Sequence, residues 1–311
     1  MGIVTLTTDF GLADGYVGTM KGVILSIAPC TAIVDISHEI SPQDVLGGAF
    51  VLGSAYPYFP NGTVHVAVVD PGVGSERRAV AVGSQEGFFI APDNGLLTFV
   101  LADHGCLADL GGCSRPHHLP EGEGIGTPLE GVQKQWLRPD GASGQFPLQM
   151  VPLPEGLTAV VLTESRFWLP DVSATFHGRD IFSPVGAHLS RGVRLEELGR
   201  SVDTLHVFAL PRPERQSNGS LLVTVIHVDG FGNAITNAKQ GDIPYRQFEV
   251  EAGGLVMPLG AAYAAGEDFL VLFGSTGRLE VAKRNGNAAA EMGLRVGSTL
   301  IVRPLARGGE Q

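Results

Sequence analysis

Apolar stretches of strand length alternate with helix-length amphipathic segments through the first hundred residues, and this alternation limits the fold more than any other feature. Strands are expected over 3–8, 32–36 and 63–69, because each run is short, apolar and followed by turn residues. Helical spacing of apolar residues predicts helices over 15–28 and from Ser41-Pro42 to about Tyr58. Strands that alternate with helices form a mostly parallel sheet covered by helices.

The pattern changes beyond about residue 200, where short β-type runs follow one another. Turns rich in Gly, Asn, Asp or Pro separate these runs, which cover 221–228, 247–251, 254–257, 269–273, 278–282 and 299–303. Short strands at this spacing are typical of a small β-sandwich or barrel. We therefore expect an α/β chain with an N-terminal sheet domain over 1–195 and a smaller C-terminal β-barrel domain over 196–311.

One segment of the N-terminal half lacks periodicity. Residues from about 105 to 156 are rich in Gly, Pro and polar side chains, and we interpret them as a long loop inserted into the domain. The adjacent pair His117-His118 lies there, and neighbouring residues on a strand would point to opposite faces. Because no Cys or HExxH pattern accompanies the pair, no metal site is expected.

Charge and cysteine usage exclude several classes of partner. Acidic residues outnumber basic ones by 32 to 21, and a net charge of −11 disfavours binding to nucleic acid. No apolar run reaches the 18 residues of a membrane span, and the N-terminus does not resemble a secretory signal. Three cysteines without a CxxC motif predict a cytoplasmic protein without a disulfide framework.

Two carboxylates follow predicted strands directly. Asp9 comes after the first strand and Asp70 after the third. Ligands of parallel α/β sheets bind at the carboxyl ends of the strands, so both residues are candidate site groups. Aspartate is also a common turn residue, and either position taken alone is equally compatible with that role.

Four further glycine-containing motifs carry polar side chains. They are Asp70-Pro71-Gly72-Val73-Gly74-Ser75-Glu76-Arg77-Arg78, Thr175-Phe176-His177-Gly178-Arg179-Asp180, Asp229-Gly230-Phe231-Gly232-Asn233, and Gly274-Ser275-Thr276-Gly277-Arg278 with the later Asn285. Each motif taken alone is compatible with a plain turn or a helix start. None matches a phosphate-binding GxGxxG or P-loop pattern, and no GxSxG nucleophile elbow is present. Glycine, with 43 residues, is about twice as frequent as the usual ~7%; glycines recur in these motifs, and others cluster in the insertion.

Taken in order, these motifs resemble the S-adenosylmethionine hydroxide adenosyltransferase family, whose relatives include the adenosyl chloride and fluoride synthases. The resemblance covers TTDFG, DPGVGSERR, APDNGLL, TFHGRDIFSPV, VDGFGNAITN and GSTGRLEVAKRNGNAA, which together span nearly the whole chain outside 105–156. It implies an N-terminal α/β domain and a C-terminal β-barrel. It also implies a homotrimer in which the substrate lies between domains of neighbouring subunits, with adenosine and methionine as products and no cofactor.

The resemblance also implies roles for individual residues. The family's water-activating triad falls on Asp70, Arg77 and His177. The fluoride enzyme has Tyr in place of Asp70 and Ser in place of Gly178, so this chain is more similar to the hydroxide branch. The resemblance assigns the ribose hydroxyls to Asp9, the methionine end to Asp229 and Ser275, and the adenine or methionine wall to Asn233. Phe231 matches an aromatic packing residue, and Asn285 lies in the segment that meets the adenine.

Two other functions are compatible with the same motifs. A halide-dependent adenosyltransferase would form 5′-chloroadenosine, although Asp70 argues against it. A nucleoside-binding protein could keep the pocket without turnover, although the intact triad residues argue against that. The spacing around Asn285 differs by one residue from some relatives, and the family usually has a short link where this chain has its insertion.

Overall fold

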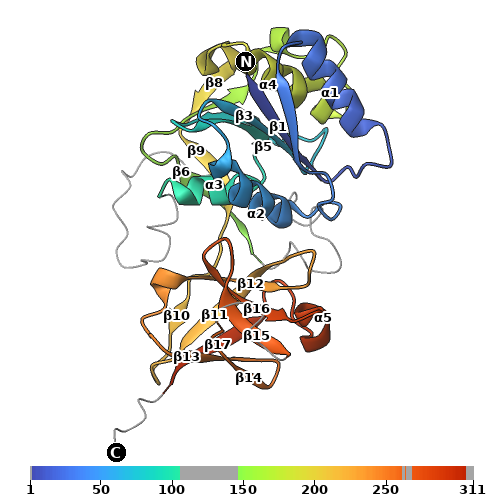
Figure 1. Cartoon of the computed structure of the whole chain (residues 1–311). Coiled ribbons are helices and arrows are strands. Elements are labelled where there is room, and N and C mark those ends of the chain that lie inside the picture. Colours follow the sequence, from blue (N-terminus) through green and yellow to red (C-terminus); the bar gives the residue numbers. More distant parts are fainter. Residues whose placement is uncertain (1, 106–145, 261–262, 264–267, 306–311) are drawn as a thin grey trace, which may run out of the picture. The chain divides into compact units, whose positions relative to one another are not determined.

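The computed structural model describes residues 2–105, 146–260, 263 and 268–305 (Figure 1). The chain divides into two compact units, Met1–Ala209 and Leu210–Gln311. The first unit therefore continues beyond residue 195, where we expected the N-terminal domain to end. It does so because two further strands, β8 (Gly199–Val202) and β9 (Thr204–Phe208), pair with strands of that unit.

The first unit alternates strands and helices. Its remaining elements are β1 (Ile3–Thr8), α1 (Tyr16–Ile27), β2 (Ala32–Ser37), α2 (Val45–Ala55), β3 (Thr63–Val68), β4 (Ala79–Gly83), β5 (Gly87–Pro92), α3 (Thr98–Asp103), β6 (Leu148–Pro152), β7 (Thr158–Leu162) and α4 (Ser183–Ser190). A π-helical turn over Gly178–Phe182 precedes α4 directly.

Seven of these strands form one sheet in the order β2-β1-β3-β5-β4-β7-β8. The pairs β1–β2, β1–β3 and β3–β5 are parallel, and β4, β7 and β8 extend the sheet by antiparallel pairing. In the parallel part, Thr8 lies opposite Val68, so β1 and β3 end side by side. The expected α/β sheet is confirmed, and its parallel part is the part that carries the candidate residues.

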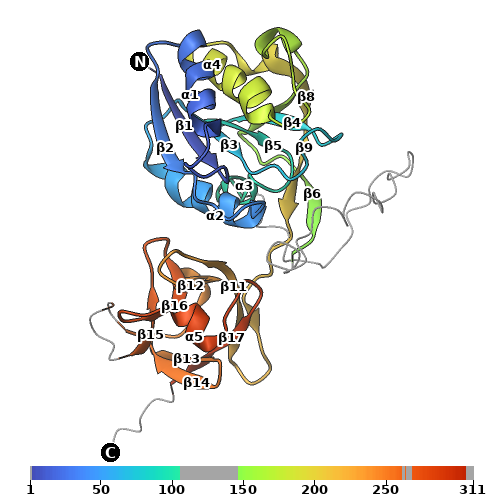
Figure 2. The same cartoon turned by 90° about the vertical axis from the view of Figure 1, so that its right-hand side faces the viewer.

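Helices cover both faces of this sheet. Helices α1 and α4 lie together on one face, while α2 and α3 lie on the other (Figures 1 and 2). The core of the first face joins Val4 and Leu6 of β1 to Met20 and Ile24 of α1, all of them fully buried. Burying such side chains contributes roughly 1.5–3 kcal/mol each. The sheet is therefore a rigid base for the loops at its carboxyl edge.

Two local predictions were wrong. Helix α2 begins at Val45 and is capped by Asp44, whose side chain accepts a hydrogen bond from Gly47 N (2.9 Å), rather than beginning at Ser41-Pro42. Part of the segment predicted as a loop over 105–156 is a strand, because β6 pairs with β9 in a separate two-stranded ribbon. The rest of that segment, with His117 and His118, lies outside the described residues.

The second unit is an antiparallel barrel-like sheet. Its elements are β10 (Glu214–Arg215), β11 (Leu221–Val228), β12 (Ala234–Lys239), β13 (Phe248–Ala252), β14 (Leu255–Pro258), β15 (Phe269–Phe273), β16 (Arg278–Lys283), α5 (Ala288–Met292) and β17 (Thr299–Pro304). The strands run in the order β14-β13-β17-β11-β12-β16-β15, and β10 pairs with β11. Leu259, just after β14, bridges to Val271 of β15 and joins the two ends of the sheet. The expected C-terminal barrel is thereby confirmed.

Candidate active site

Asp9 and Asp70 emerge from the same edge of the first unit's sheet, as their positions after β1 and β3 predict. The register of these parallel strands brings the ends of both strands to one rim. Asp9 Oδ2 accepts a hydrogen bond from Gln43 N (2.7 Å), which lies in the loop before α2. Gln43 has a φ of 67°, a left-handed conformation that a residue other than glycine seldom adopts.

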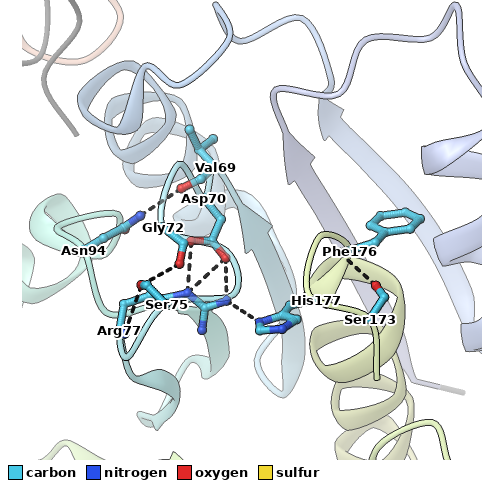
Figure 3. A network of polar contacts seen from close by, with 9 residues as sticks. All are labelled: Val69, Asp70, Gly72, Ser75, Arg77, Asn94, Ser173, Phe176 and His177. Carbon is cyan, nitrogen blue, oxygen red and sulfur yellow. Dashed lines mark hydrogen bonds and ion pairs between the residues drawn. The ribbon is translucent and has the colours of Figure 1, made fainter. Parts of the chain in front are cut away.

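Asp70, Arg77 and His177 form one connected group (Figure 3). Arg77 Nε donates to Asp70 Oδ1 and Oδ2 at 3.0 Å each, and Arg77 Nη2 donates to Oδ2 at 2.5 Å. The same Nη2 donates to His177 Nδ1 at 2.7 Å. The Asp70 and Arg77 side chains are only 4% and 11% exposed, so this ion pair is largely shielded from water. The sequence motifs identified these three residues, and the structure brings them together.

The contact with Arg77 fixes the protonation of His177. A guanidinium group only donates, so Nδ1 must accept, and the remaining ring proton of the neutral imidazole lies on Nε2. Burial lowers the pKa of His177 and the charge of Arg77 lowers it further, while Asp70, Asp180 and the Ser173 backbone act in the opposite direction. His177 is therefore neutral at physiological pH and presents an N–H group at Nε2.

The loop from Asp70 to Arg77 needs glycine at one particular position. Gly74 has a φ of 77°, and a side chain there would collide with the backbone carbonyl of Ala174 in the loop that carries His177. Ser75 holds the turn internally, since its hydroxyl donates to Gly72 O (2.7 Å) and accepts from Arg77 N (3.2 Å). The close approach at Gly74 allows Arg77 and His177 to meet.

A buried carboxylate shapes the segment around His177. Asp180 is fully buried and accepts hydrogen bonds from Ser173 N (2.8 Å), Ser173 Oγ (2.7 Å) and Arg179 Nε (2.5 Å). Burial alone would raise the pKa of Asp180, but the hydrogen bonds from Arg179 and Ser173 lower it. Ser173 therefore anchors the loop that precedes His177. His177 stands directly before the π-helical turn, a geometry often found at functional sites.

Three aromatic rings from the segments that carry Asp9 and His177 pack on one another. Phe10 and Phe176 meet edge to face at 5.7 Å, and Tyr16 approaches them at 5.9 and 5.1 Å. Phe10 belongs to the motif of Asp9, and Phe176 to that of His177. The sequence motifs gave these rings no role. Two of them lie within the motifs, and that position could have indicated that they belong to the site. The three rings form an aromatic cluster that joins the segments of Asp9 and His177.

The candidate residues of the second unit cluster in part. Asp229 Oδ1 accepts from Phe231 N (3.0 Å) and Asn233 N (2.9 Å), and Oδ2 accepts from Asn233 Nδ2 (2.9 Å). This turn joins β11 to β12 and leaves the Phe231 ring 82% exposed. Ser275, between β15 and β16, and Asn285, which follows β16 with a φ of 54°, are exposed on other loops of the barrel.

A second buried carboxylate in the barrel was not among our candidates. Glu280 of β16 is 4% exposed, and the Tyr263 hydroxyl donates to it. Burial raises the pKa of Glu280, and the charge of Asp229 raises it further, against the hydrogen bond from Tyr263. Asn233 connects the two carboxylates, because its Nδ2 also lies 3.4 Å from the Tyr263 hydroxyl.

Neither a metal site nor a membrane span is evident in the parts of the chain that the structure describes. No three His, Cys, Asp or Glu side chains of these parts converge as ion ligands would. None of the described helices combines the length and the apolar character that crossing a bilayer requires. Cys30 is an exposed free thiol, and Cys106 and Cys113 lie outside the described residues.

Comparison with known proteins places both units in one family. The model of the SAM hydroxide adenosyltransferase N-terminal domain matches residues 4–111 and 143–199, and that of the C-terminal domain matches 223–301. An (R)-S-adenosyl-L-methionine hydrolase of Salinispora tropica is 35% identical over 303 residues, 96% of this chain and 97% of the relative. A fluorinase of Actinoplanes sp. is 27% identical over 338 residues, 96% of this chain and 97% of that protein.

A solved structure agrees with this placement. The crystal structure of an uncharacterised conserved protein from Thermotoga maritima superposes with a TM-score of 0.74 at 28% identity, over 97% of this chain and 99% of the other. Matches to both domain models, together with a hydrolase relative of nearly equal length, show that the chain belongs to the SAM hydroxide adenosyltransferase family.

Proposed function

We propose that this protein hydrolyses S-adenosylmethionine to adenosine and L-methionine. The observation that carries the proposal is the connected Asp70–Arg77–His177 group at the carboxyl edge of the sheet. Relatives at 31–35% identity over most of the chain are named (R)-S-adenosyl-L-methionine hydrolase. In the reaction, a water oxygen forms a bond to ribose C5′ while the C5′–S bond breaks. The electron pair goes to sulfur, and the water releases one proton.

The hydrogen bonds suggest how the three residues divide this work. His177 Nδ1 is occupied by Arg77 and Nε2 carries a proton, so the neutral ring is a donor that can hold the water oxygen. Asp70 Oδ2 accepts from both Arg77 Nε and Arg77 Nη2, whereas Oδ1 accepts only from Nε and keeps a second lone pair. We assign Asp70 as the acceptor of the water proton, with Arg77 stabilising the charge. Such general-base assistance contributes roughly 10²–10⁴-fold, and orientation of the water contributes further.

The remaining residues would bind the substrate. Asp9 would accept hydrogen bonds from the ribose hydroxyls at the sheet edge that it shares with Asp70. Asp229 and Ser275 would meet the methionine end, with Asn233 and Phe231 as a wall and Asn285 near the adenine. We further propose a homotrimer in which a neighbouring subunit supplies these barrel residues. We also propose a cytoplasmic location, for a protein that needs no cofactor.

Halide-dependent transfer fits this chain less well. A Cβ atom at Gly178 would lie 3.2 Å from Phe176 Cε2, 3.3 Å from Met20 Sδ and 3.3 Å from Phe10 Cε2. The serine that the fluoride enzyme carries there would therefore require at least one of these side chains to shift. A binding protein without turnover would not need the buried Asp70–Arg77 pair, whose desolvation is costly.

Isotope labelling tests the proposal directly. In water enriched in ¹⁸O, the protein should produce adenosine with ¹⁸O in its 5′-hydroxyl, together with an equal amount of methionine. His177→Ala should abolish this product, while His188→Ala, a half-buried histidine that packs edge to face on Phe167, should retain it. Unlabelled adenosine, 5′-chloroadenosine in the presence of chloride, or a fully active His177→Ala protein would contradict the proposal.

A further inference from the structure

The turn between β5 and α3 contacts both ends of the loop that carries Asp70 and Arg77. Its sequence is Pro92-Asp93-Asn94-Gly95, one of the family motifs to which no role has been assigned above. Asn94 Nδ2 donates to the carbonyl of Val69 at 2.9 Å, one residue before Asp70 (Figure 3). Asp93 N donates to the carbonyl of Arg78 at 2.9 Å, one residue after Arg77.

The side chain of Asp93 strengthens the second contact. Arg78 Nε donates to Asp93 Oδ2 at 2.7 Å, and Arg78 Nη2 donates to the same oxygen and to Thr204 O (2.9 Å). His206 donates to Asp93 through its backbone N and through Nδ1, both at 2.8 Å. The Asp93 carboxylate is 2% exposed, and buried charge-assisted hydrogen bonds are the strong ones. Arg78 is thus fixed between β5 and β9.

The β6–β9 ribbon supports this turn from behind. Gly95 has a φ of 94°, and a Cβ atom there would lie 2.7 Å from Leu148 Cδ2 and 2.8 Å from Phe208 Cε2. Phe208 N also donates to Thr98 Oγ1 at 2.9 Å, which ties β9 to the first turn of α3. The ribbon therefore packs tightly on the turn and leaves it little freedom to move.

We propose that Asp93 and Asn94 are positioning residues that set the distance and angle between Asp70, Arg77 and His177. This inference rests on the proposed function of that group. Each end of the catalytic loop is bonded to one of two adjacent residues in a single turn, so both ends move as one body. A displacement of about 1 Å at a reacting group can cost roughly 10²-fold in rate, so the effect of releasing one end is measurable.

Asn94→Ala removes the Val69 contact with little change in charge. We expect kcat for S-adenosylmethionine to fall roughly 10- to 100-fold while KM changes little, because the loop orients reacting groups rather than binding substrate. The matched control is Ser84→Ala in the turn at the opposite end of the β4–β5 hairpin. Its hydroxyl likewise bonds backbone groups, accepting from Glu86 N (3.1 Å) and Gly87 N (3.2 Å), and its loss should leave kcat unchanged.

A second readout does not depend on turnover. Arg77 lowers the pKa of His177 more than Asp70 raises it, so displacing the loop should raise the pKa of His177 toward its ordinary value of about 6.5. The titration can be followed by NMR on histidine-labelled protein, with the resonance assigned through His177→Gln. Ser84→Ala should leave the titration of His177 as in the native protein.

The two readouts separate this inference from the proposed function. A native protein that does not turn over S-adenosylmethionine overturns the proposed function, and the His177 titration then decides the inference alone. An Asn94→Ala protein whose His177 titrates as in the native protein overturns the inference, whatever its rate. Asp93→Asn should show a larger shift if it folds, and Arg78→Lys, which keeps a cation beside Asp93, should show a smaller shift than Arg78→Met.

Discussion

In the first unit, Asp70, Arg77 and His177 hold one another by hydrogen bonds in a largely buried group. In the second unit, Phe231, Ser275 and Asn285 lie exposed on separate loops of the barrel. Groups that must keep fixed angles during a reaction are thus cross-bonded within one unit, whereas these three groups, assigned to ligand contact, remain open to solvent. The comparison predicts that substitutions in the Asp70–Arg77–His177 group change kcat and that substitutions among the barrel residues change KM.

Asp70→Asn should give the largest effect. The amide cannot accept the water proton, so we expect kcat to fall roughly 10²–10⁴-fold, with a smaller change in KM. Steady-state kinetics on S-adenosylmethionine measures both constants. Asp35→Asn is the matched control, because Asp35 also lies on the parallel sheet but forms a surface ion pair with Lys21 at 2.6 Å. Equal losses in the two variants would mean that the effect is structural.

The two units should also differ in their response to acid. Burial lowers the pKa of His65 to about 4, below its ordinary value of about 6.5. The unfolded chain then binds more protons between these values, so stability present above about pH 6.5 is lost as the pH falls toward 4. The loss amounts to about 3 kcal/mol. The second unit contains one of the nine histidines, His227.

Tryptophan fluorescence can follow the first unit alone, because both tryptophans, Trp136 and Trp168, precede residue 210. Urea unfolding at pH 7.5 and pH 4.5 should show the fluorescence transition moving to lower urea, while a later circular-dichroism transition from the barrel moves less. His65→Gln should reduce the shift. Transitions that coincide at both pH values would show instead that the two units unfold together.

Asp229→Asn tests the second half of the comparison. Asp229 accepts three hydrogen bonds in the β11–β12 turn. In Asp229→Asn an NH2 group replaces one accepting oxygen and would face an N–H donor. We expect KM to rise roughly 10-fold, because a hydrogen bond to a charged group contributes about 1.5–3 kcal/mol, with kcat nearly unchanged. Asp242→Asn is the control, since that carboxylate also accepts a backbone N–H, from Lys239 at 2.7 Å. A selective loss of kcat would contradict the division of roles.

Gly178→Ser should have the smallest effect. The added atoms must displace Phe176, Met20 or Phe10, and overpacking of this kind costs about 1 kcal/mol or somewhat more. Thermal unfolding should therefore shift to lower temperature, and chloride should not yield 5′-chloroadenosine. Gly22→Ser on α1 is the control, because no neighbouring atom lies within 4 Å of a Cβ atom there. A Gly178→Ser protein of native stability would show that the side chains around Gly178 are pliable.

Periodicity predicted the elements that depend on local patterns, such as β1, β3 and α1. It failed where distant partners decide the structure. The start of α2 shifted because Gln43 adopts a φ of 67° while its N–H bonds to Asp9, and no helix signal encodes that contact. Strand β6 was missed because five residues after a glycine-rich segment carry little pattern, and their pairing with β9 is a long-range event.

The candidate site shows the same division. Motif chemistry identified Asp70, Arg77 and His177 because each bears a functional group beside a glycine or a strand end. It gave no sign that Arg78 and His206 form a network around the buried Asp93, because His206 lies more than a hundred residues from Asp93 and belongs to no motif. Supporting residues are specified by three-dimensional neighbours, and the sequence shows them only after the fold is known.

Closure of the barrel through Leu259 and Val271 affects how the molecule behaves in concentrated solution. A sheet joined to itself presents few free backbone groups to a strand from another chain. The open sheet of the first unit keeps two edges, β2 and β8. Strand β8 is only four residues long and carries Arg200, while β2 carries Asp35, and short, charged edges resist edge-to-edge aggregation. Partial unfolding that removes an edge strand of the first unit would expose the apolar strand next to it, so we expect aggregation to begin in this unit.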